Sequence, residues 1–432
     1  MPSRQAAPSR PDAHRGPVDS RPPAPWWCGT VAFAGLAVVL WIVVGVSVAW
    51  LPWSQPRTHF FPGRPWLEGW VHFDAGWYRE IANNGYSYTP GAQSSVAFFP
   101  AYPLAMRGVA TLLGSTLLSG IVVTAAAGCA AATMVWAWFR DRLSPSAAWT
   151  ALGLFLLYPY AFYLFGAVYA DALFIAALLA AFLLLESDHI WLAGLAGAVA
   201  TAARPIGLVV VAGLVVRAME RRGVFPRGKV DGGRTGATAE GADDDRADDD
   251  SEATARSGRL PLVDLRRLSW RDAPILVSVA GLGAYAFFLA RRFDNPFLFA
   301  DVEQYWGQGA GPRTWFKVEF FKGVTNFGDP PSWLAYVAHP IVVLVALAMV
   351  PRVFRRFGWG YGVFCVLAVG LAAFSTKDFF GSGRYVLAAF PCFAAGADLL
   401  VEHPKLRPWA LGASGGALLV MTSLFARGSY LS

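Results

Sequence analysis

The first long apolar stretch of the chain, Thr30–Trp50 (TVAFAGLAVVLWIVVGVSVAW), decides the fold class. It carries no charge and is long enough to cross the roughly 30 Å hydrocarbon core of a bilayer as a helix. Strict alternation is absent, which excludes a membrane β-barrel. The fold predicted is all-α, a polytopic membrane helix bundle. Further apolar runs lie at about 117–138, 147–165, 170–186, 190–217, 273–290, 334–350, 358–375, 385–402 and 409–426.

Composition excludes the other broad classes. A chain of 432 residues would suit two or three soluble domains, but 55% of its residues are hydrophobic and 15% charged, against about 25% charged in soluble domains. The net charge of +7 is attributed to the positive-inside bias of membrane proteins, so no nucleic-acid partner is expected. No CxxC, HExxH or Walker-type motif occurs, so no metal site or disulfide framework is indicated.

Polar segments divide the chain into four parts. Residues 1–25 predict a disordered cytoplasmic tail, because arginines precede the first span. Residues 26–217 form the N-terminal transmembrane half, in which the aromatic-rich segment 51–113 is the catalytic loop. Residues 218–272 predict a charged, disordered cytoplasmic loop, and residues 273–432 form the C-terminal transmembrane half. The localisation predicted is a multi-pass plasma-membrane protein with its active site outside the cytoplasm.

The run 190–217 is interrupted by Arg204-Pro205. It can be one kinked helix or two short helices that meet at the membrane face. We choose two, which gives about 11 spans in total. This choice places most of the 36 Lys and Arg residues on the cytoplasmic side, as the positive-inside rule prefers.

One acidic run has the composition of a metal site or of a site that binds a nucleotide sugar. Asp243–Asp245 and Asp248–Asp250 lie among Gly, Ala, Thr and Arg, with no apolar residues to fix a site. We therefore interpret the run as a solvated acidic linker.

Polar residues from several distant segments fall on one side of the membrane under this topology. Ionisable groups at the bilayer edge are costly and usually line a functional cavity. Their convergence predicts a single site. The residues are Asp74, Asp171, Arg204, Gln304, Lys377, Asp378 and Arg384.

Asp74 opens an amphipathic stretch in which Trp77 and Tyr78 share its helical face. A carboxylate beside aromatic rings can act as a general base for a sugar or lipid hydroxyl while the rings stack on the sugar. The alternative is a helix-capping aspartate with interfacial aromatic anchors. Asp171 begins an apolar helix and has the same capping alternative.

The remaining cations suit a phosphate ligand. Arg204 lies between two apolar halves and Arg384 follows Ser382-Gly383. A guanidinium matches phosphate oxygens by charge and by its forked hydrogen bonds, although it can also snorkel to lipid headgroups. Glycine near Arg384 would let the backbone approach a ligand closely. Lys377 either contacts substrate or pairs with Asp378.

These residues resemble the PIG-V-type mannosyltransferases of the GT-C superfamily. The resemblance spans about residues 30–427, without the acidic loop. Phe73, Asp171 and Gln308 depart from residues frequent in that family, which has Trp, Glu and Arg there. The matching motifs, in family order, are His72–Tyr78, Ala97–Leu104, Tyr169–Phe174, Arg204–Gly207, Phe293–Pro296, Gln304–Gly307 and Gly383–Leu387.

The resemblance implies a GT-C-like fold, a polyprenyl-phosphate sugar donor, usually of mannose, and a glycolipid or related saccharide acceptor. It implies that Asp74 is the catalytic base and that Arg204 and Arg384 bind the donor phosphate. Asp171 would bind sugar hydroxyls or assist the base, and Gln304 and Trp306 would line a substrate groove.

The reaction predicted is hexosyl transfer with inversion. No cofactor is expected beyond the lipid-linked donor, and a divalent metal is left open. The alternatives are another polyprenyl-linked sugar, a transporter or flippase of lipid-linked saccharides, and a non-catalytic assembly partner in the membrane.

Overall fold

The computed structural model of the chain is helical. It describes residues 24–55, 59–225, 267, 269–306, 311–325 and 330–431, and these contain helices and connecting loops without a β-strand. The all-α prediction is confirmed for this part of the chain. The predicted disorder of the N-terminal tail and of the acidic linker falls mainly outside the described residues.

In the described part of the chain, five helices are long and apolar enough to cross a membrane, or six if one bent pair counts as a span. The bent pair is α16 (Ser382–Ala388) with α17 (Phe390–Glu402), which meet at 78°. The predicted number of about 11 is therefore not confirmed. The five long helices are α1 (Cys28–Trp50), α5 (Thr116–Arg142), η5 with α10 (Trp270–Phe293), α14 (Pro330–Phe357) and α18 (Arg407–Ala426).

Shorter apolar helices complete the bundle. They are α6 (Pro145–Leu156), α7 (Asp171–Glu186), α8 (Ile190–Ala203), α9 (Gly207–Arg221) and α15 (Trp359–Ser375). The apolar run 147–165 yields only α6 as an α-helix, followed by the 3₁₀ turn η2 (Ala161–Leu164). Pro159 explains the early end, since a proline disfavours helical backbone in the residue before it and clashes with the preceding turn.

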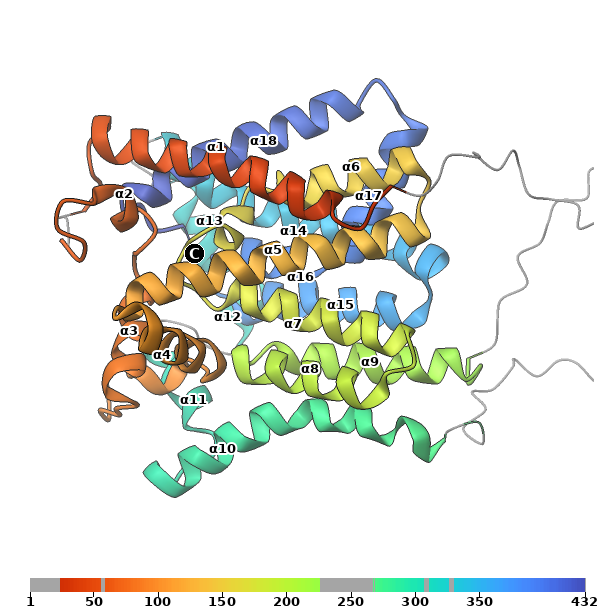
Figure 1. The fold of residues 1–432 in the computed structure, drawn as a ribbon, viewed down its shortest axis with the longest axis horizontal. Helices are drawn as coiled ribbons and strands as arrows, with labels where there is room; N and C mark the ends of the chain where they lie inside the picture. The colour runs from red at the N-terminus through yellow and green to blue at the C-terminus, as the bar shows by residue number, and fades with distance from the viewer. Residues whose placement is uncertain are drawn as a thin grey trace, which may run out of the picture.

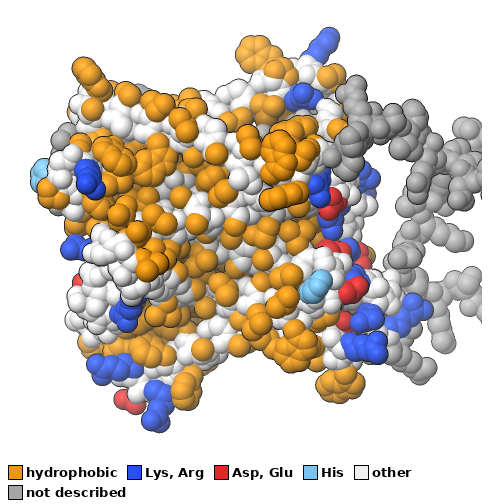
Figure 2. All heavy atoms as spheres, viewed as in Figure 1, with side chains coloured by type: hydrophobic (Ala, Val, Ile, Leu, Met, Phe, Trp, Pro, Cys, Tyr) orange, Lys and Arg blue, Asp and Glu red, His pale blue; other side chains and the backbone are white. Residues whose placement is uncertain are grey.

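The helices lie side by side, and the connecting segments gather at two ends (Figure 1). We call the left end in Figure 1 the loop end and the right end the opposite end. The start of α1, the end of α9 and the start of η5 lie at the opposite end. Apolar side chains cover the band between the ends, and charged side chains collect at the ends (Figure 2). At the loop end lie α2 (Pro65–Glu68), α3 (Asp74–Asn84), α4 (Ala101–Leu113), α11 (Leu298–Asp301), α12 (Pro312–Trp315) and α13 (Val318–Gly323).

The segment 190–217 forms two antiparallel helices, as predicted. Arg204, between α8 and α9, pairs with Asp171 at the start of α7. Arg217, on α9, pairs with Glu186 at the end of α7, with 2.7 Å between Nε and Oε1. The chain therefore reverses at residues 204–206. Arg204 has extended backbone (φ −154°, ψ 148°), as the residue before a proline prefers.

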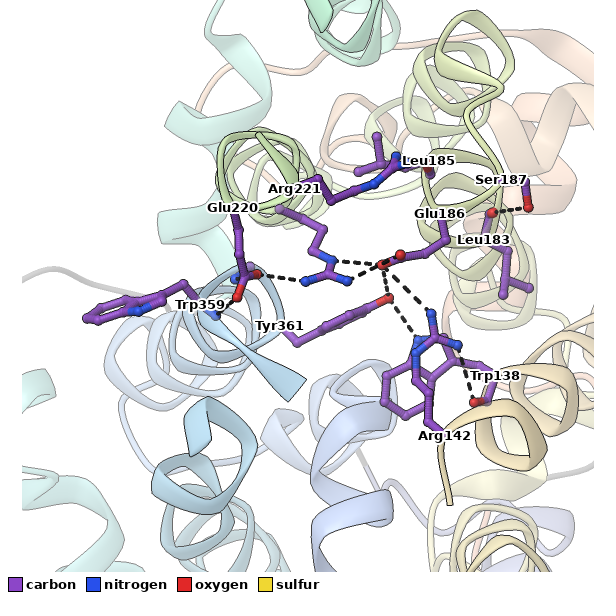
Figure 3. Close-up of polar contacts among 12 residues, drawn as sticks. Trp138, Arg142, Leu183, Leu185, Glu186, Ser187, Glu220, Arg221, Trp359 and Tyr361 are labelled. Carbon is purple, nitrogen blue, oxygen red and sulfur yellow. Dashed lines mark hydrogen bonds and ion pairs between the residues drawn. The ribbon is translucent and has the colours of Figure 1, made fainter. Parts of the chain in front are cut away.

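Charged side chains join four helices at the opposite end (Figure 3). Arg217 donates from Nε to Glu186 Oε1 at 2.7 Å and from Nη1 to Glu220 Oε2 at 2.9 Å. Tyr361 donates its hydroxyl to Glu186 Oε1 at 2.9 Å and accepts from Trp138 Nε1 at 2.8 Å. We call Glu186, Arg217, Glu220 and Tyr361 the clamp. It fixes α7 and α9 to α15, and through Trp138 to α5.

The clamp also caps a helix. Glu220 accepts the backbone N–H groups of Trp359 (2.8 Å) and Gly360 (3.1 Å). Those groups are among the first of α15 and have no partner within the helix. A carboxylate at this position also suits the positive end of the helix dipole.

Removing the central carboxylate of the clamp should destabilise the fold. We expect Glu186→Ala to lower the free energy of unfolding by about 2 kcal/mol, since hydrogen bonds to charged groups contribute roughly 1.5–3 kcal/mol and Arg217 and Tyr361 would both lose theirs. Thermal unfolding in detergent micelles measures the loss. The control is Glu319→Ala, which removes an exposed carboxylate paired with Arg313 and should not change stability measurably. Equal stability of the two variants would contradict the role of the clamp.

Candidate active site

Asp74 is the first residue of α3 and follows a strained turn. Phe73, directly before it, has φ 52° and ψ −107°, a backbone conformation that non-glycine residues rarely adopt. The backbone N–H of Asp74 donates to the Tyr169 hydroxyl at 3.4 Å. The turn therefore directs the chain into α3 with a carboxylate at the helix N-terminus, where the helix dipole favours negative charge.

Four charged side chains meet beside this turn. Arg384 Nη1 lies 3.6 Å from Asp74 Oδ2 and 3.6 Å from Asp171 Oδ2. Arg204 pairs with the other oxygen of Asp171 through Nη1. We call Asp74, Arg384, Asp171 and Arg204 the charge quartet. Its members come from α3, α16, α7 and the break between α8 and α9, and its formal charge is zero.

The quartet is buried, and parts of it lack hydrogen-bond partners. The Asp74 side chain is 23% exposed, whereas that of Asp171 is 3% exposed. Among the described residues, Arg384 Nε and Nη1 and Asp171 Oδ2 have no hydrogen-bond partner. Arg384 Cζ lies 5.2 Å from the ring centroids of both Tyr163 and Tyr169. Ion pairs and aromatic faces thus hold this guanidinium, and two of its buried nitrogens are left without a hydrogen bond in the described part of the chain.

Gly383 sets the position of Arg384. Its N–H donates to His339 Nδ1 at 3.1 Å, and its carbonyl accepts the Tyr158 hydroxyl at 2.8 Å. A Cβ atom on Gly383 would lie 2.4 Å from Cε2 of Tyr160. The expectation that glycine here lets the backbone approach a ligand stays a prediction, and the close approach that the structure shows is that of an aromatic ring. Gly383 admits the Tyr160 ring, which stacks on His339 with ring centroids 4.8 Å apart.

The quartet borders a cavity of about 1160 Å³ at the loop end. Of the predicted site residues, Asp171 and Trp77 do not line this cavity. Asp171 lies behind it, between the two arginines. Trp77 stacks on Phe98, which does line it, with centroids 5.8 Å apart. The predicted residues that line the cavity are Asp74, Tyr78, Arg204, Gln304, Trp306, Lys377, Asp378 and Arg384.

Lys377 does not pair with Asp378 in the described part of the chain. Asp378 Oδ1 instead accepts the backbone N–H of Phe380 at 3.1 Å. Lys377 lines the cavity and forms no ion pair with a described residue. Of the other predictions for these loops, Gln304 donates to the Asp301 carbonyl at 2.8 Å, and Gln308 lies outside the described residues.

Two further charged residues at the site were missed by the sequence reasoning. Glu303 lines the cavity directly before Gln304. Lys317 is buried, donates to the Thr376 carbonyl and lies 4.8 Å from the centroid of the Phe379 ring. Both belong to the segment 291–333, which is rich in aromatic residues and was expected at the membrane surface. The only signal for Glu303 was its position beside the Gln304–Gly307 motif.

Burial changes the titration of these groups. It raises the pKa of Glu303 to about 7, with a further increase from the nearby charge of Asp74. Burial also raises the pKa of Asp74, although Arg384 and Arg204 oppose the rise. The pKa of Lys317 is lowered to about 8 by burial, against the influence of Asp378. Two carboxyl groups with raised pKa therefore face one cavity, an arrangement suited to acid–base chemistry near neutral pH.

Comparison with known proteins yields distant structural likenesses. No family model and no curated protein sequence matches the chain. ArnT from Cupriavidus metallidurans, solved with undecaprenyl phosphate bound, is 12% identical with a TM-score of 0.48, over 93% of this chain and 76% of that chain. The oligosaccharyltransferase AglB from Archaeoglobus fulgidus, solved with an inhibitory peptide and dolichol-phosphate, is 11% identical with a TM-score of 0.43, over 94% of this chain and 57% of that chain.

A third solved structure, an Archaeoglobus fulgidus oligosaccharyltransferase in complex with zinc and sulfate, is 13% identical with a TM-score of 0.40. It is matched over 92% of this chain and 53% of its own length. The chain thus spans little more than half of the archaeal proteins. Likenesses of this size do not carry a function from one protein to another, so the function has to be inferred from the site itself.

A methyl group on Gly383 should disturb the site. We expect Gly383→Ala to destabilise the protein by about 1–3 kcal/mol, the usual cost of overpacking. The reason is that the Tyr160 ring would have to move away from the added methyl group. Thermal unfolding in detergent micelles measures the effect. The matched control is Gly370→Ala on α15, where a Cβ meets no atom within 4 Å. Gly383→Ala with the stability of the control would contradict the tight packing described above.

Proposed function

We propose that the chain is an integral membrane glycosyltransferase of the GT-C type. It moves a hexose, mannose, from a polyprenyl-phosphate donor to a hydroxyl group of a glycolipid or related saccharide. The observation that carries this proposal is the charge quartet at the edge of the cavity. There, one partly exposed carboxylate, Asp74, is paired with a guanidinium whose Nε and Nη1 have no hydrogen-bond partner among the described residues.

Asp74 acts as the general base in this reaction. It lines the cavity and accepts the proton of the acceptor hydroxyl, whose oxygen then attacks the anomeric carbon of the donor sugar. The bond from that carbon to the phosphate oxygen breaks, and the phosphate leaves with the electron pair. One base and a departing phosphate lead to inversion at the anomeric carbon, because no carboxylate nucleophile is needed.

Arg384 and Arg204 stabilise the departing phosphate. Before the reaction, each is paired with a carboxylate of the quartet. When Asp74 takes a proton, it becomes neutral. Of the two carboxylates paired with Arg384, only Asp171 then remains charged, while negative charge grows on the phosphate. Preorganised positive charge at the point where negative charge develops is the strongest form of electrostatic catalysis.

The walls of the cavity favour a lipid-linked donor. Leu371 and Phe374 border the cavity on α15 and are 51% and 63% exposed. On an apolar helix of a membrane bundle, exposed Leu and Phe side chains face lipid. A polyprenyl chain can therefore remain in the bilayer while its phosphate reaches Lys377, just beyond the end of the same helix.

The proposed location of the reaction is the extracytoplasmic face. Asp74 is the first residue of α3, which lies at the loop end, opposite to the start of α1. The arginine-rich tail before α1 predicts a cytoplasmic N-terminus, so the site would face the other side. A transporter of lipid-linked saccharides is less well supported, because transporters place their charged residues near the membrane midplane, whereas Asp74 belongs to a helix of the loop end.

Replacing Asp74 tests the proposal. We expect Asp74→Asn in lipid nanodiscs to transfer radiolabelled mannose from polyprenyl-phosphate mannose at least 100-fold more slowly than the wild type, since general-base catalysis contributes roughly 10²–10⁴-fold. The matched control is Glu80→Gln, an exposed carboxylate on the same helix that accepts only from Asn84. Near-normal turnover by a folded Asp74→Asn protein would remove Asp74 from the chemistry. A wild type that cleaves no polyprenyl-phosphate sugar would overturn the transferase.

Lys377 should act on donor binding rather than on turnover. Loss of its charge by Lys377→Ala is expected to raise the KM for the donor roughly tenfold, the effect of about 1.4 kcal/mol, because its ammonium group would contact the phosphate. Lys377→Arg should restore most of the affinity, and Lys405→Ala at the opposite end serves as the control. A donor KM equal to that of the wild type in Lys377→Ala would place the phosphate elsewhere.

A further inference from the structure

We propose that Glu303 binds the acceptor through its hydroxyl groups, and that the acceptor presents a sugar ring rather than an isolated alcohol. This inference rests on the proposed transferase and assigns a role to a residue that the mechanism above does not use. Asp74 remains the base. Glu303 holds the acceptor beside it.

Glu303 is a carboxylate available to a ligand. It belongs to η6 (Val302–Trp306), is half-buried and lines the same cavity as Asp74. It forms no hydrogen bond and no ion pair with the described residues. Its neighbour Asp301, in contrast, accepts from Asn295 Nδ2 at 2.7 Å. A half-buried carboxylate without a partner is costly, and hydroxyl groups of a ligand would satisfy it.

An aromatic wall lies next to this carboxylate. Trp306 and Phe98 both line the cavity. Their ring centroids are 5.9 Å apart at 74°, and Trp77 packs against both rings from outside the cavity. Because Trp77 packs against both Trp306 and Phe98, these two rings form a rigid apolar surface. A sugar ring offers C–H groups to such a surface and hydroxyl groups to a carboxylate, whereas a simple alcohol offers one hydroxyl.

The two substrates would then contact different parts of the chain. Lys377 and the lipid-facing side chains belong to α15 and the loop after it, whereas Glu303, Gln304 and Trp306 belong to η6. Asp74, from α3, lines the same cavity as these three residues. An acceptor bound at η6 therefore brings its hydroxyl group close to the base.

The protonation of Glu303 makes acceptor binding depend on pH. The charged groups that act on it are Asp74 on α3, which raises its pKa, and Arg204 at the break between α8 and α9, which opposes the rise. Of the elements packed against η6, α11 carries the charged residue Asp301, and η1 (Ser95–Ala97) carries none. With a pKa of about 7, the group is mostly protonated at pH 6 and mostly ionised at pH 8. The ionised form accepts hydroxyl hydrogen bonds more strongly.

The kinetic test separates acceptor binding from turnover. The full chain in nanodiscs is assayed with saturating polyprenyl-phosphate mannose and octyl α-mannoside as the acceptor. The KM of the wild type for octyl α-mannoside should fall about tenfold from pH 6 to pH 8, as expected for one group with a pKa of about 7. Glu303→Gln should have a high KM that does not change with pH, with a kcat at saturating acceptor close to that of the wild type. Glu319→Gln, in the exposed helix α13, is the matched control.

A second measurement does not require transfer. Dicyclohexylcarbodiimide labels protonated carboxyl groups in apolar surroundings, and mass spectrometry of peptides locates the label. Without donor, octyl α-mannoside should protect Glu303 from labelling, and n-octanol should not. Absence of protection, or equal protection by n-octanol, would overturn the assignment, and so would a Glu303→Gln protein with the acceptor KM and pH dependence of the wild type.

The two proposals fail in different ways. If octyl α-mannoside protects Glu303 but the wild type transfers no sugar, the sugar site stands and the transferase fails. If the wild type transfers mannose while Glu303→Gln behaves normally, the transferase stands and the role of Glu303 fails.

Discussion

The structure depends on one guanidinium held between two carboxylates. Arg384 lies 3.6 Å from both Asp74 and Asp171, and none of the three could remain charged in an apolar bundle alone. Desolvation of a single ion costs several kcal/mol, and breaking a buried pair leaves the remaining charge without compensation. The three residues come from α16, α3 and α7, so these helices have to be in register for any of the charges to be tolerated. The same constraint that closes the loop end of the bundle therefore builds the site.

Helix α7 connects the charge quartet with the clamp at the opposite end of the bundle. Its first residue, Asp171, pairs with Arg204, and its last residue, Glu186, pairs with Arg217. A carboxylate is unfavourable at the negative end of a helix dipole, and Arg217 offsets this for Glu186. Because Arg204 directly precedes α9 and Arg217 lies near its C-terminal end, the two pairs fix α7 and α9 against each other at both ends. The clamp thus supports the geometry of a site at the other end of the bundle.

Much of this arrangement follows from the sequence, and its limits have physical causes. Uninterrupted apolar runs specify helices locally, and the cost of charge in a membrane is enough to predict that Asp74, Arg204 and Arg384 converge. Pro159 ends α6 early, although the apolar run continues, so hydropathy alone predicts a longer helix than the structure has. Glu303 could not be recognised, because its burial arises from segments distant in the chain, which the local sequence does not reveal.

The pairing of a base with an arginine poses a chemical problem that the quartet resolves. An ion pair lowers the proton affinity of a carboxylate, so Arg384 alone would make Asp74 a weak base. Burial acts in the other direction and raises the pKa of Asp74, which restores its basicity without removing the arginine. In the proposed reaction, the proton that reaches Asp74 frees Arg384 for the phosphate at the moment when that group gains charge. Proton transfer and departure of the phosphate then favour each other, and a site of zero formal charge can stabilise an anion that forms only during the reaction.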